Sequence, residues 1–257
     1  MADREFARLE RAPAYRLVYD AIERQIIGGK LKIGDPLPAE TQLAEQFGVN
    51  RSTVREGIRL LEQSGLVERE GGKRPRISVP HYMDLASSAS RALFHHSVTF
   101  RELWEASMLI EPALAEIAAT KATDGDLADM EANIARMEAA TTRIEAHEPF
   151  DVDDFVDLDR AFHDILAKAA HNRVLILAHE PVSMLFIPAG RLILPRLHTH
   201  RRVLDAHRFI FDGLKQHDVA KTRKWMRLHM QDFRRGYEMT GLDVDMTLDA
   251  TRLGLSD

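Results

Sequence analysis

Four residues in the second half of the chain have the types and the spacing of a metal site. Asp159 and His163 are four residues apart, so on one helix they lie along the same edge. His207 and His229 fall on the apolar stripes of two later helical segments. Because an unpaired polar group is costly to bury, one divalent metal ion per chain, held by three nitrogens and one oxygen, would satisfy all four.

This prediction depends on the set of four rather than on any one histidine. A single buried histidine is commonly satisfied by a hydrogen bond to the backbone, and that interpretation stays open for each one taken alone. The other histidines have neither the helical phase nor a motif, and we expect them on the surface. They include His95, His96, His147, His171, His198, His200 and His217.

A second chemical feature is a group of hydrogen-bond donors within the segment 37–79. This segment has the pattern of a helix, a tight turn, a second helix and a two-stranded hairpin, which is typical of a winged helix-turn-helix. Gly48 is expected to end the first helix and Asn50 to cap the second. The residues predicted to contact DNA are Asn50, Arg51, Ser52, Thr53 and Arg55 of the second helix and Gly72, Lys73 and Arg74 of the wing.

The charge distribution agrees with this assignment, although the total of −5 is unusual for a nucleic-acid binder. Residues 1–80 hold 14 basic and 12 acidic residues, whereas residues 81–257 hold 21 and 28. The segment from Arg51 to Arg76 has seven basic and four acidic residues. Positive charge is therefore concentrated at the predicted reading surface.

Helical periodicity dominates the remainder of the chain. After residue 99 we place helices at about 100–121, 124–146, 152–170, 172–196, 199–216 and 218–239. The short connections between them predict an antiparallel bundle. The expected fold is mostly α, with an N-terminal winged helix-turn-helix domain that has a small β wing and a C-terminal all-α antiparallel helical bundle. The expected divisions are a flexible N-terminus at 1–12, the winged domain at 13–80, a partly helical linker at 81–98, the bundle at 99–240 and a tail at 241–257.

Composition narrows the compartment and the chemistry. The chain has no cysteine, which excludes disulfides and thiolate metal ligands and fits a reducing cytoplasm. The N-terminal residues lack the apolar core of a secretion signal. The most apolar window, Val182 to Pro195, is interrupted by proline, glycine and arginine, so no membrane span is expected. These observations favour a cytoplasmic protein.

The N-terminal motifs resemble those of a known family. LPAE, followed by a helix and then GVNRSTVREGIRLLEQSGLV, is similar to the DNA-binding domain of GntR-family bacterial transcription regulators. This resemblance covers roughly residues 13 to 80 and implies a homodimer that binds a pseudo-palindromic operator in double-stranded DNA. Thr41 stands where many members have a base-reading arginine, which implies a different operator.

The C-terminal segments resemble the FCD domain of the FadR subfamily. The blocks DLDRAFHDILAKAAHN, AHRFIFDGLKQHD and MRLHM match members that bind metal through D-x-x-x-H and two later histidines 22 residues apart. The resemblance implies that Asp159, His163, His207 and His229 are the ligands. Zinc is the expected ion, with nickel or manganese as alternatives. It also implies that this domain binds an effector and dimerises.

The effector is expected to be a small anionic metabolite such as an organic acid. Members that sense carboxylates carry an arginine in a pattern like E-x-R-x-x-L-E-P, but in LWEASMLIEP that position is Ser107. A carboxylate would then be held by the metal or by another cation. The candidate effector-binding positions are Ser107, Arg191 and Arg196.

The leading hypothesis is a ligand-responsive transcription regulator, acting as a repressor. One alternative is a metal-dependent, hydrolase-like enzyme, because a metal with an open position can activate water. No motif near the ligands identifies a separate general base, which disfavours it. A second alternative is a metal-free sensor of a larger ligand, such as an acyl thioester.

Overall fold

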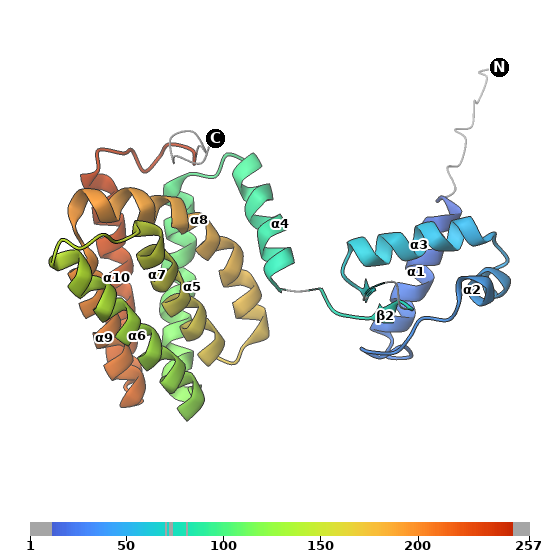
Figure 1. The fold of residues 1–257 in the computed structure, drawn as a ribbon, viewed down its shortest axis with the longest axis horizontal. Helices are drawn as coiled ribbons and strands as arrows, with labels where there is room; N and C mark the ends of the chain where they lie inside the picture. The colour runs from blue at the N-terminus through green and yellow to red at the C-terminus, as the bar shows by residue number, and fades with distance from the viewer. Residues whose placement is uncertain (1–11, 70, 72–73, 81, 249–257) are drawn as a thin grey trace, which may run out of the picture. The chain divides into compact units, whose positions relative to one another are not determined.

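The chain folds into two compact units, one up to residue 81 and one from Tyr82 onward (Figure 1). The computed structural model describes residues 12–69, 71, 74–80 and 82–248. Within these residues the fold is mostly helical, with one small antiparallel hairpin, as the sequence predicts.

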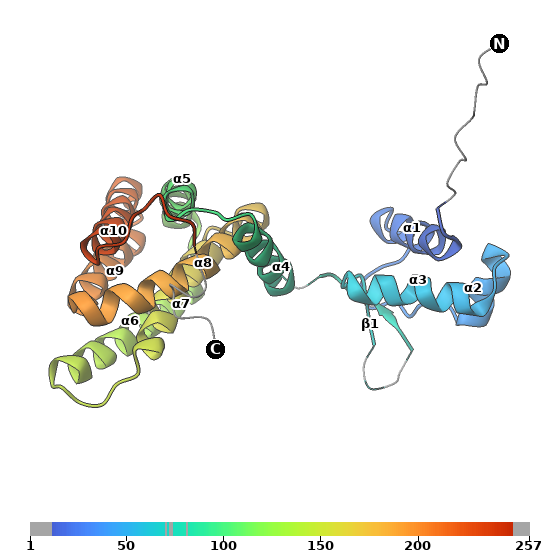
Figure 2. The ribbon, with the colours of Figure 1, turned by 90° about the horizontal axis from the view of Figure 1, so that it is seen from above.

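The first unit contains the predicted helix-turn-helix and wing. Its elements are α1 (Ala14–Ile27), α2 (Glu40–Phe47), α3 (Arg51–Gln63), β1 (Val67–Glu68) and β2 (Arg76–Ile77). Gly48 ends α2 with a left-handed φ of 65°, and the Asn50 side chain accepts a hydrogen bond from Thr53 N to cap α3. Figure 2 shows β1 following the C-terminal end of α3. The core of this unit is formed by Val18, Ile22, Leu37, Val54, Ile58 and Leu61, among others.

The wing is short but has a defined register. Val67 pairs with Ile77, and Glu68 pairs with Arg76. Val67 and Ile77 are both buried, so the hairpin presents one face to the core of the unit. Leu37 N also donates a hydrogen bond to Pro75 O at 2.9 Å, which ties the wing to the segment before α2.

The second unit is a bundle of long helices with short connections. Its helices are α4 (Tyr82–His95), α5 (Phe100–Lys121), α6 (Asp124–Glu145), α7 (Val152–Ala169), α8 (Arg173–Leu197), α9 (His200–Lys215) and α10 (Val219–Met239). Figures 1 and 2 show α10 beside α5 and α9, and these pairs are in contact. Thr123 is the N-cap of α6, because its hydroxyl accepts from Asp126 N.

The structure describes residues 82–98 of the expected partly helical linker and residues 241–248 of the expected tail. Residues 82–95 form α4, which packs on α8, and the Ser90 hydroxyl donates to Pro181 O at 2.9 Å. After α10 the chain returns to the start of α5, where Arg101 N donates to Val244 O at 2.9 Å. Val244 and Leu248 are buried. Residues 82–95 and the described residues up to 248 therefore belong to the packed structure of the second unit.

The helix α8 is long and apolar enough to meet the length and composition test for a membrane span. Half of its most apolar window is buried within the unit, as in a core helix. It also carries the buried polar residues His179, Glu180 and Ser183. Its position in the bundle therefore accounts for its apolar character.

Candidate metal centre and nucleic-acid interface

The bundle brings the four predicted ligands together. Asp159 and His163 lie on α7, His207 on α9 and His229 on α10, and one ligand atom from each lies within 4.8 Å of all the others. His229 Nε2 is 3.2 Å from His163 Nε2 and 3.3 Å from His207 Nε2. Asp159 Oδ1 is 3.3 Å from His207 Nε2. Side chains from three helices thus converge on one small volume.

These separations suit a divalent ion. Neighbouring ligand atoms lie about 3.3 Å apart in a tetrahedral site with metal–nitrogen bonds of about 2.0–2.1 Å. Asp159 Oδ1 is buried and forms no hydrogen bond in the structure, although His207 is near it. A cation at the centre would satisfy this acceptor and the three ring nitrogens.

Glu111 on α5 holds one ligand in the orientation that a metal requires. Its Oε2 accepts from His163 Nδ1 at 3.0 Å, and its Oε1 accepts from His179 Nε2 of α8 at 2.8 Å. Because its Nδ1–H donates to Glu111, His163 presents Nε2 to the cluster, where a metal ion would take the place of the Nε2 proton. Burial opposes the charge on Glu111, but His163 and His179 hold the pKa of its carboxyl well below its usual range.

The remaining pKa values follow from burial and from the nearby charges. Burial lowers the pKa of His163, but the Glu111 carboxylate outweighs that effect and raises it to about 9. Burial lowers the pKa of His229 to about 3 and that of His207 well below its ordinary value. Burial raises the pKa of Asp159 to about 6. His207 and His229 are therefore neutral, which is the form that binds metals.

A cavity of about 40 Å³ adjoins the cluster. Its walls come from α5, α7, α8 and α10 and consist of Glu111, Val156, Asp159, Arg160, His163, Ser183, Phe186, Ile187, Gly190, His229, Met230 and Phe233. A second cavity of similar volume shares Asp159, Gly190, His229 and Phe233 with the first. The cluster therefore borders enclosed space that a ligand or water can enter.

The three candidate effector positions lie outside the walls of both cavities. Ser107 is buried on α5. Arg191 Nε forms an ion pair with Asp153 Oδ1 at 2.8 Å, and Arg196 is exposed near the end of α8. The arrangement gives none of these residues a contact with a ligand in the cavities.

Sequence reasoning missed Glu111 and His179 and misplaced one other histidine. His200 was expected on the surface, but it is buried against the ring of Phe155, and burial lowers its pKa. This expectation was wrong because the histidine falls at the start of α9, where the first turn packs on α7. His147, His171, His198 and His217 are exposed residues with positive φ at helix ends.

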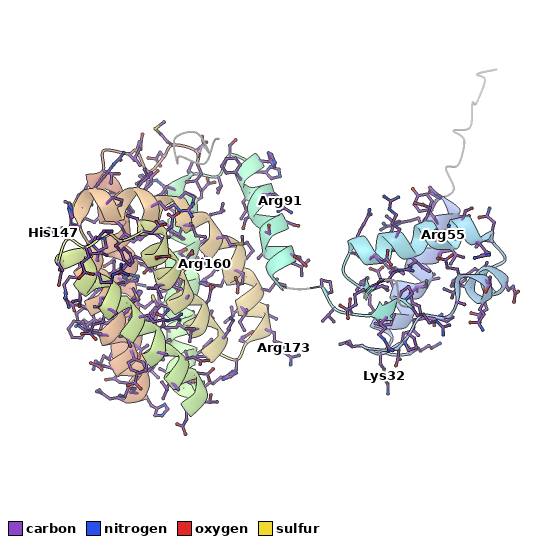
Figure 3. All side chains as sticks on the ribbon, viewed as in Figure 1. Lys32, Arg55, Arg91, His147, Arg160 and Arg173 are labelled. Atoms are coloured by element: carbon purple, nitrogen blue, oxygen red, sulfur yellow. The ribbon has the colours of Figure 1, made fainter. Side chains whose placement is uncertain are left out.

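The start of α3 has the donors of a nucleic-acid interface, but they are not equally available. Asn50 Oδ1 accepts from the hydroxyls of Ser52 and Thr53 at 2.7 Å each, in addition to the Thr53 N–H. These three residues therefore build the cap. Arg51 is exposed and forms no ion pair among the described residues, whereas Arg55 pairs with Glu40 of α2 at 3.1 Å (Figure 3).

Of the three wing residues predicted to contact DNA, the structure describes one. Arg74 is exposed beside the hairpin. Gly72 and Lys73 lie outside the described residues. Arg76 faces the body of the unit, because its Nη1 donates to Gly34 O at 2.7 Å. Both described arginines of the hairpin are exposed, and Arg74 forms no hydrogen bond or ion pair among the described residues, so it is the freer of the two to bind a phosphate.

Models of known protein families match both the N-terminal and the C-terminal unit of the chain. The family model described as "Bacterial regulatory proteins, gntR family" matches residues 14–77, and the model of the FCD domain matches residues 102–232. The Glc operon transcriptional activator of Escherichia coli (strain K12) is 33% identical over 167 residues, which are 65% of each chain. The match therefore spans slightly less than two thirds of that relative.

Other matches extend over more of the chain. The HTH-type transcriptional repressor NanR of Salmonella newport (strain SL254) is 27% identical over 227 residues, covering 86% of this chain and 84% of the relative. The structure described as Streptococcus agalactiae GntR has a TM-score of 0.59 and 26% identity, covering 86% of this chain and 99% of that one. The named relatives include both an activator and a repressor.

Proposed function

Because the chain belongs to the gntR family of bacterial regulatory proteins and carries an FCD domain, we propose that it is a ligand-responsive repressor in the cytoplasm. Its FCD domain binds one divalent metal ion and a small anionic metabolite, and the metabolite modulates operator binding. The protein acts as a homodimer on a pseudo-palindromic operator in double-stranded DNA. Zinc is the ion that best suits three imidazoles and one carboxylate, and nickel or manganese are the alternatives.

The observation that carries this proposal is the convergence of three imidazole nitrogens and one buried carboxylate oxygen on one small volume. Ring nitrogens as close as 3.2 Å have a physical reason when they share a cation, and burial keeps His207 and His229 in the neutral form that binds metals. Glu111 adds a second reason, since a carboxylate that accepts the far N–H of a ligand histidine is typical of metal sites. When bound, the metal supplies a positively charged centre for an anionic ligand.

The alternative functions fit less well. The chain is a DNA-binding transcription regulator and not an enzyme, as its relatives are regulators, so the hydrolase-like hypothesis is set aside. A metal-free sensor of an acyl thioester would need a large cavity. The two cavities beside the cluster are each about 40 Å³, which is too small for such a ligand.

Elemental analysis of the gently purified protein tests the metal site. We expect close to one zinc, nickel or manganese ion per chain in the wild type. His207→Ala and His229→Ala should each lose the ion and the rise in melting temperature that a metal bound only by the folded state produces. His200→Ala is the matched control, because it removes a buried histidine of α9 outside the cluster and should keep the ion.

A different result would remove this part of the proposal. A wild-type protein that is isolated without metal, cannot be loaded and melts at the same temperature with zinc, nickel or manganese added has no site in the bundle. The DNA-binding role would then stand on the N-terminal unit alone.

A further inference from the structure

Arg160 is a partly buried arginine that lines the cavity beside the metal cluster. It follows Asp159 on α7, lines the cavity together with Asp159 and His163, and is labelled in Figure 3. Its Nε is buried and has no hydrogen-bond partner. Its Nη1 lies 3.4 Å from Asp164 Oδ2, which is a long contact. Because a guanidinium has five N–H donors in a rigid fork, Arg160 retains donors for a ligand.

The rest of the wall suits a small molecule with one anionic end. Arg160 is the one arginine or lysine among the described residues that line this cavity. Ser183 contributes a hydroxyl from α8, and most of the remaining wall is apolar. The apolar lining residues are Val156, Phe186, Ile187, Met230 and Phe233.

The acidic residues of the wall are already engaged. Glu111 binds His163 and His179, and Asp159 belongs to the metal cluster. Arg160 is therefore not neutralised by either of them. An anion in the cavity would share its walls with both the guanidinium and the metal cluster, and planar carboxylates match the fork of an arginine.

The volume of the cavity limits the size of the anion. About 40 Å³ is room for roughly three water molecules. A two-carbon carboxylate such as acetate is of this size, and one of up to four carbons would extend from the cavity toward solvent. The partly exposed Arg160 side chain also allows a ligand to enter from solvent.

The geometry points to Arg160 as the residue that binds the carboxylate of a small effector, of about two to four carbons, beside the metal cluster. This inference rests on the proposed function and names its ligand class. Ser107 of α5, an earlier candidate for this role, lies outside the cavity walls.

Direct binding to the zinc-loaded full-length protein tests this assignment. Acetate, glycolate, lactate, malonate and succinate are titrated by calorimetry, and the tightest binder is carried forward. Arg160→Met should weaken its binding at least tenfold. Arg160→Lys should bind with intermediate affinity, because a lysine keeps the charge but not the fork. Arg191→Met, which removes an arginine of α8 that pairs with Asp153 of α7, should stay within twofold of the wild type.

Zinc content, melting temperature and operator affinity are measured on the same preparations. The inference is overturned if Arg160→Met binds the carboxylate within twofold of the wild type. It is also overturned if none of the five carboxylates binds a wild-type protein that holds zinc and binds its operator. The proposed metal site stands in both cases. If the wild type holds no metal, the metal-binding part of the proposed function is wrong, and the inference that rests on it fails as well. Should Arg160→Met not fold, the comparison of Arg160→Lys with Arg191→Met decides by the same twofold criterion.

Discussion

At the scale of single residues, Glu111 connects the metal cluster to the helix behind it. Its two oxygens bind His163 and His179, which belong to different helices. Replacing it by glutamine removes the charge and leaves one acceptor for two donors. We expect Glu111→Gln to weaken zinc binding by about ten- to a hundredfold, the usual effect of losing such an outer partner.

Competition with a chromogenic chelator measures this change. Glu180→Gln is the matched control, because Glu180 is also a buried glutamate but forms no hydrogen bond with a ligand histidine among the described residues. Equal zinc affinities for Glu111→Gln and the wild type would show that His163 needs no orienting carboxylate.

A second prediction at this scale concerns the two arginines of α3. Arg51→Ala and Arg55→Ala should each cost about 1–3 kcal/mol of specific operator binding if they contact base edges. Gel shifts with the upstream region of the gene measure it. Arg16→Ala on α1, where Arg16 pairs with Asp20, should change operator affinity little. Unchanged affinity in both α3 variants would remove this helix from the proposed interface.

The sequence predicted some of these residues and missed others for a physical reason. The Asp159 and His163 pair is local to one helix, and His207 and His229 lie on apolar stripes, so periodicity was enough to place them. Glu111 was missed because its partners are 52 and 68 residues away. A signal was present, since Glu111 shares helical spacing with Ser107, Leu114 and Ala118, which are buried on α5.

At the scale of elements, the bundle helices agree with the predicted ranges to within about two residues at each end. Their caps are local features, such as Asn172 before α8 and Asn50 before α3. The extent of α4 was not predictable in the same way. Residues 82–95 have an SSAS sequence that weakens a helix, and packing on α8 supplies the missing stability.

Close packing of α1 on α3 leads to a third prediction. A Cβ atom at Gly57 would lie 2.8 Å from Val18 Cγ1 and 3.0 Å from Tyr15 O. Gly57→Ala should therefore destabilise the N-terminal unit by about 1–3 kcal/mol, as overpacking does. Glu56→Ala, at the neighbouring exposed position of α3, is the control and should change stability little. Urea denaturation measures both, and equal midpoints would show that the α1–α3 contact relaxes without cost.

In the protein as a whole, an effector bound in the second unit would have to alter DNA binding by the first unit. An effector shifts operator affinity only by as much as it favours one state of the protein over another. The second unit begins with α4 at Tyr82, next along the chain after the N-terminal unit. Because α4 packs on α8, and α8 carries Ser183, Phe186 and Ile187 of the cavity wall, a change in the wall can reach α4 through contacts within the second unit.

The last prediction concerns the effect of a bound carboxylate on operator binding through α8 and α4. The tightest-binding small carboxylate should weaken operator binding by about 1–3 kcal/mol, the usual size of such a coupling. Asp159→Ala should keep operator binding and lose the response, since Asp159 lines both cavities and belongs to the cluster. Ser90→Ala, which breaks the bond between α4 and Pro181 O, should bind the carboxylate normally but show a smaller response.

Operator affinity with and without the carboxylate separates these outcomes. A full response in Asp159→Ala would mean that the cluster is structural and that the effector binds elsewhere in the bundle. A full response in Ser90→Ala alone would leave the sensing site in place. It would also show that the bond between α4 and α8 is not the contact through which the cavity acts on DNA binding.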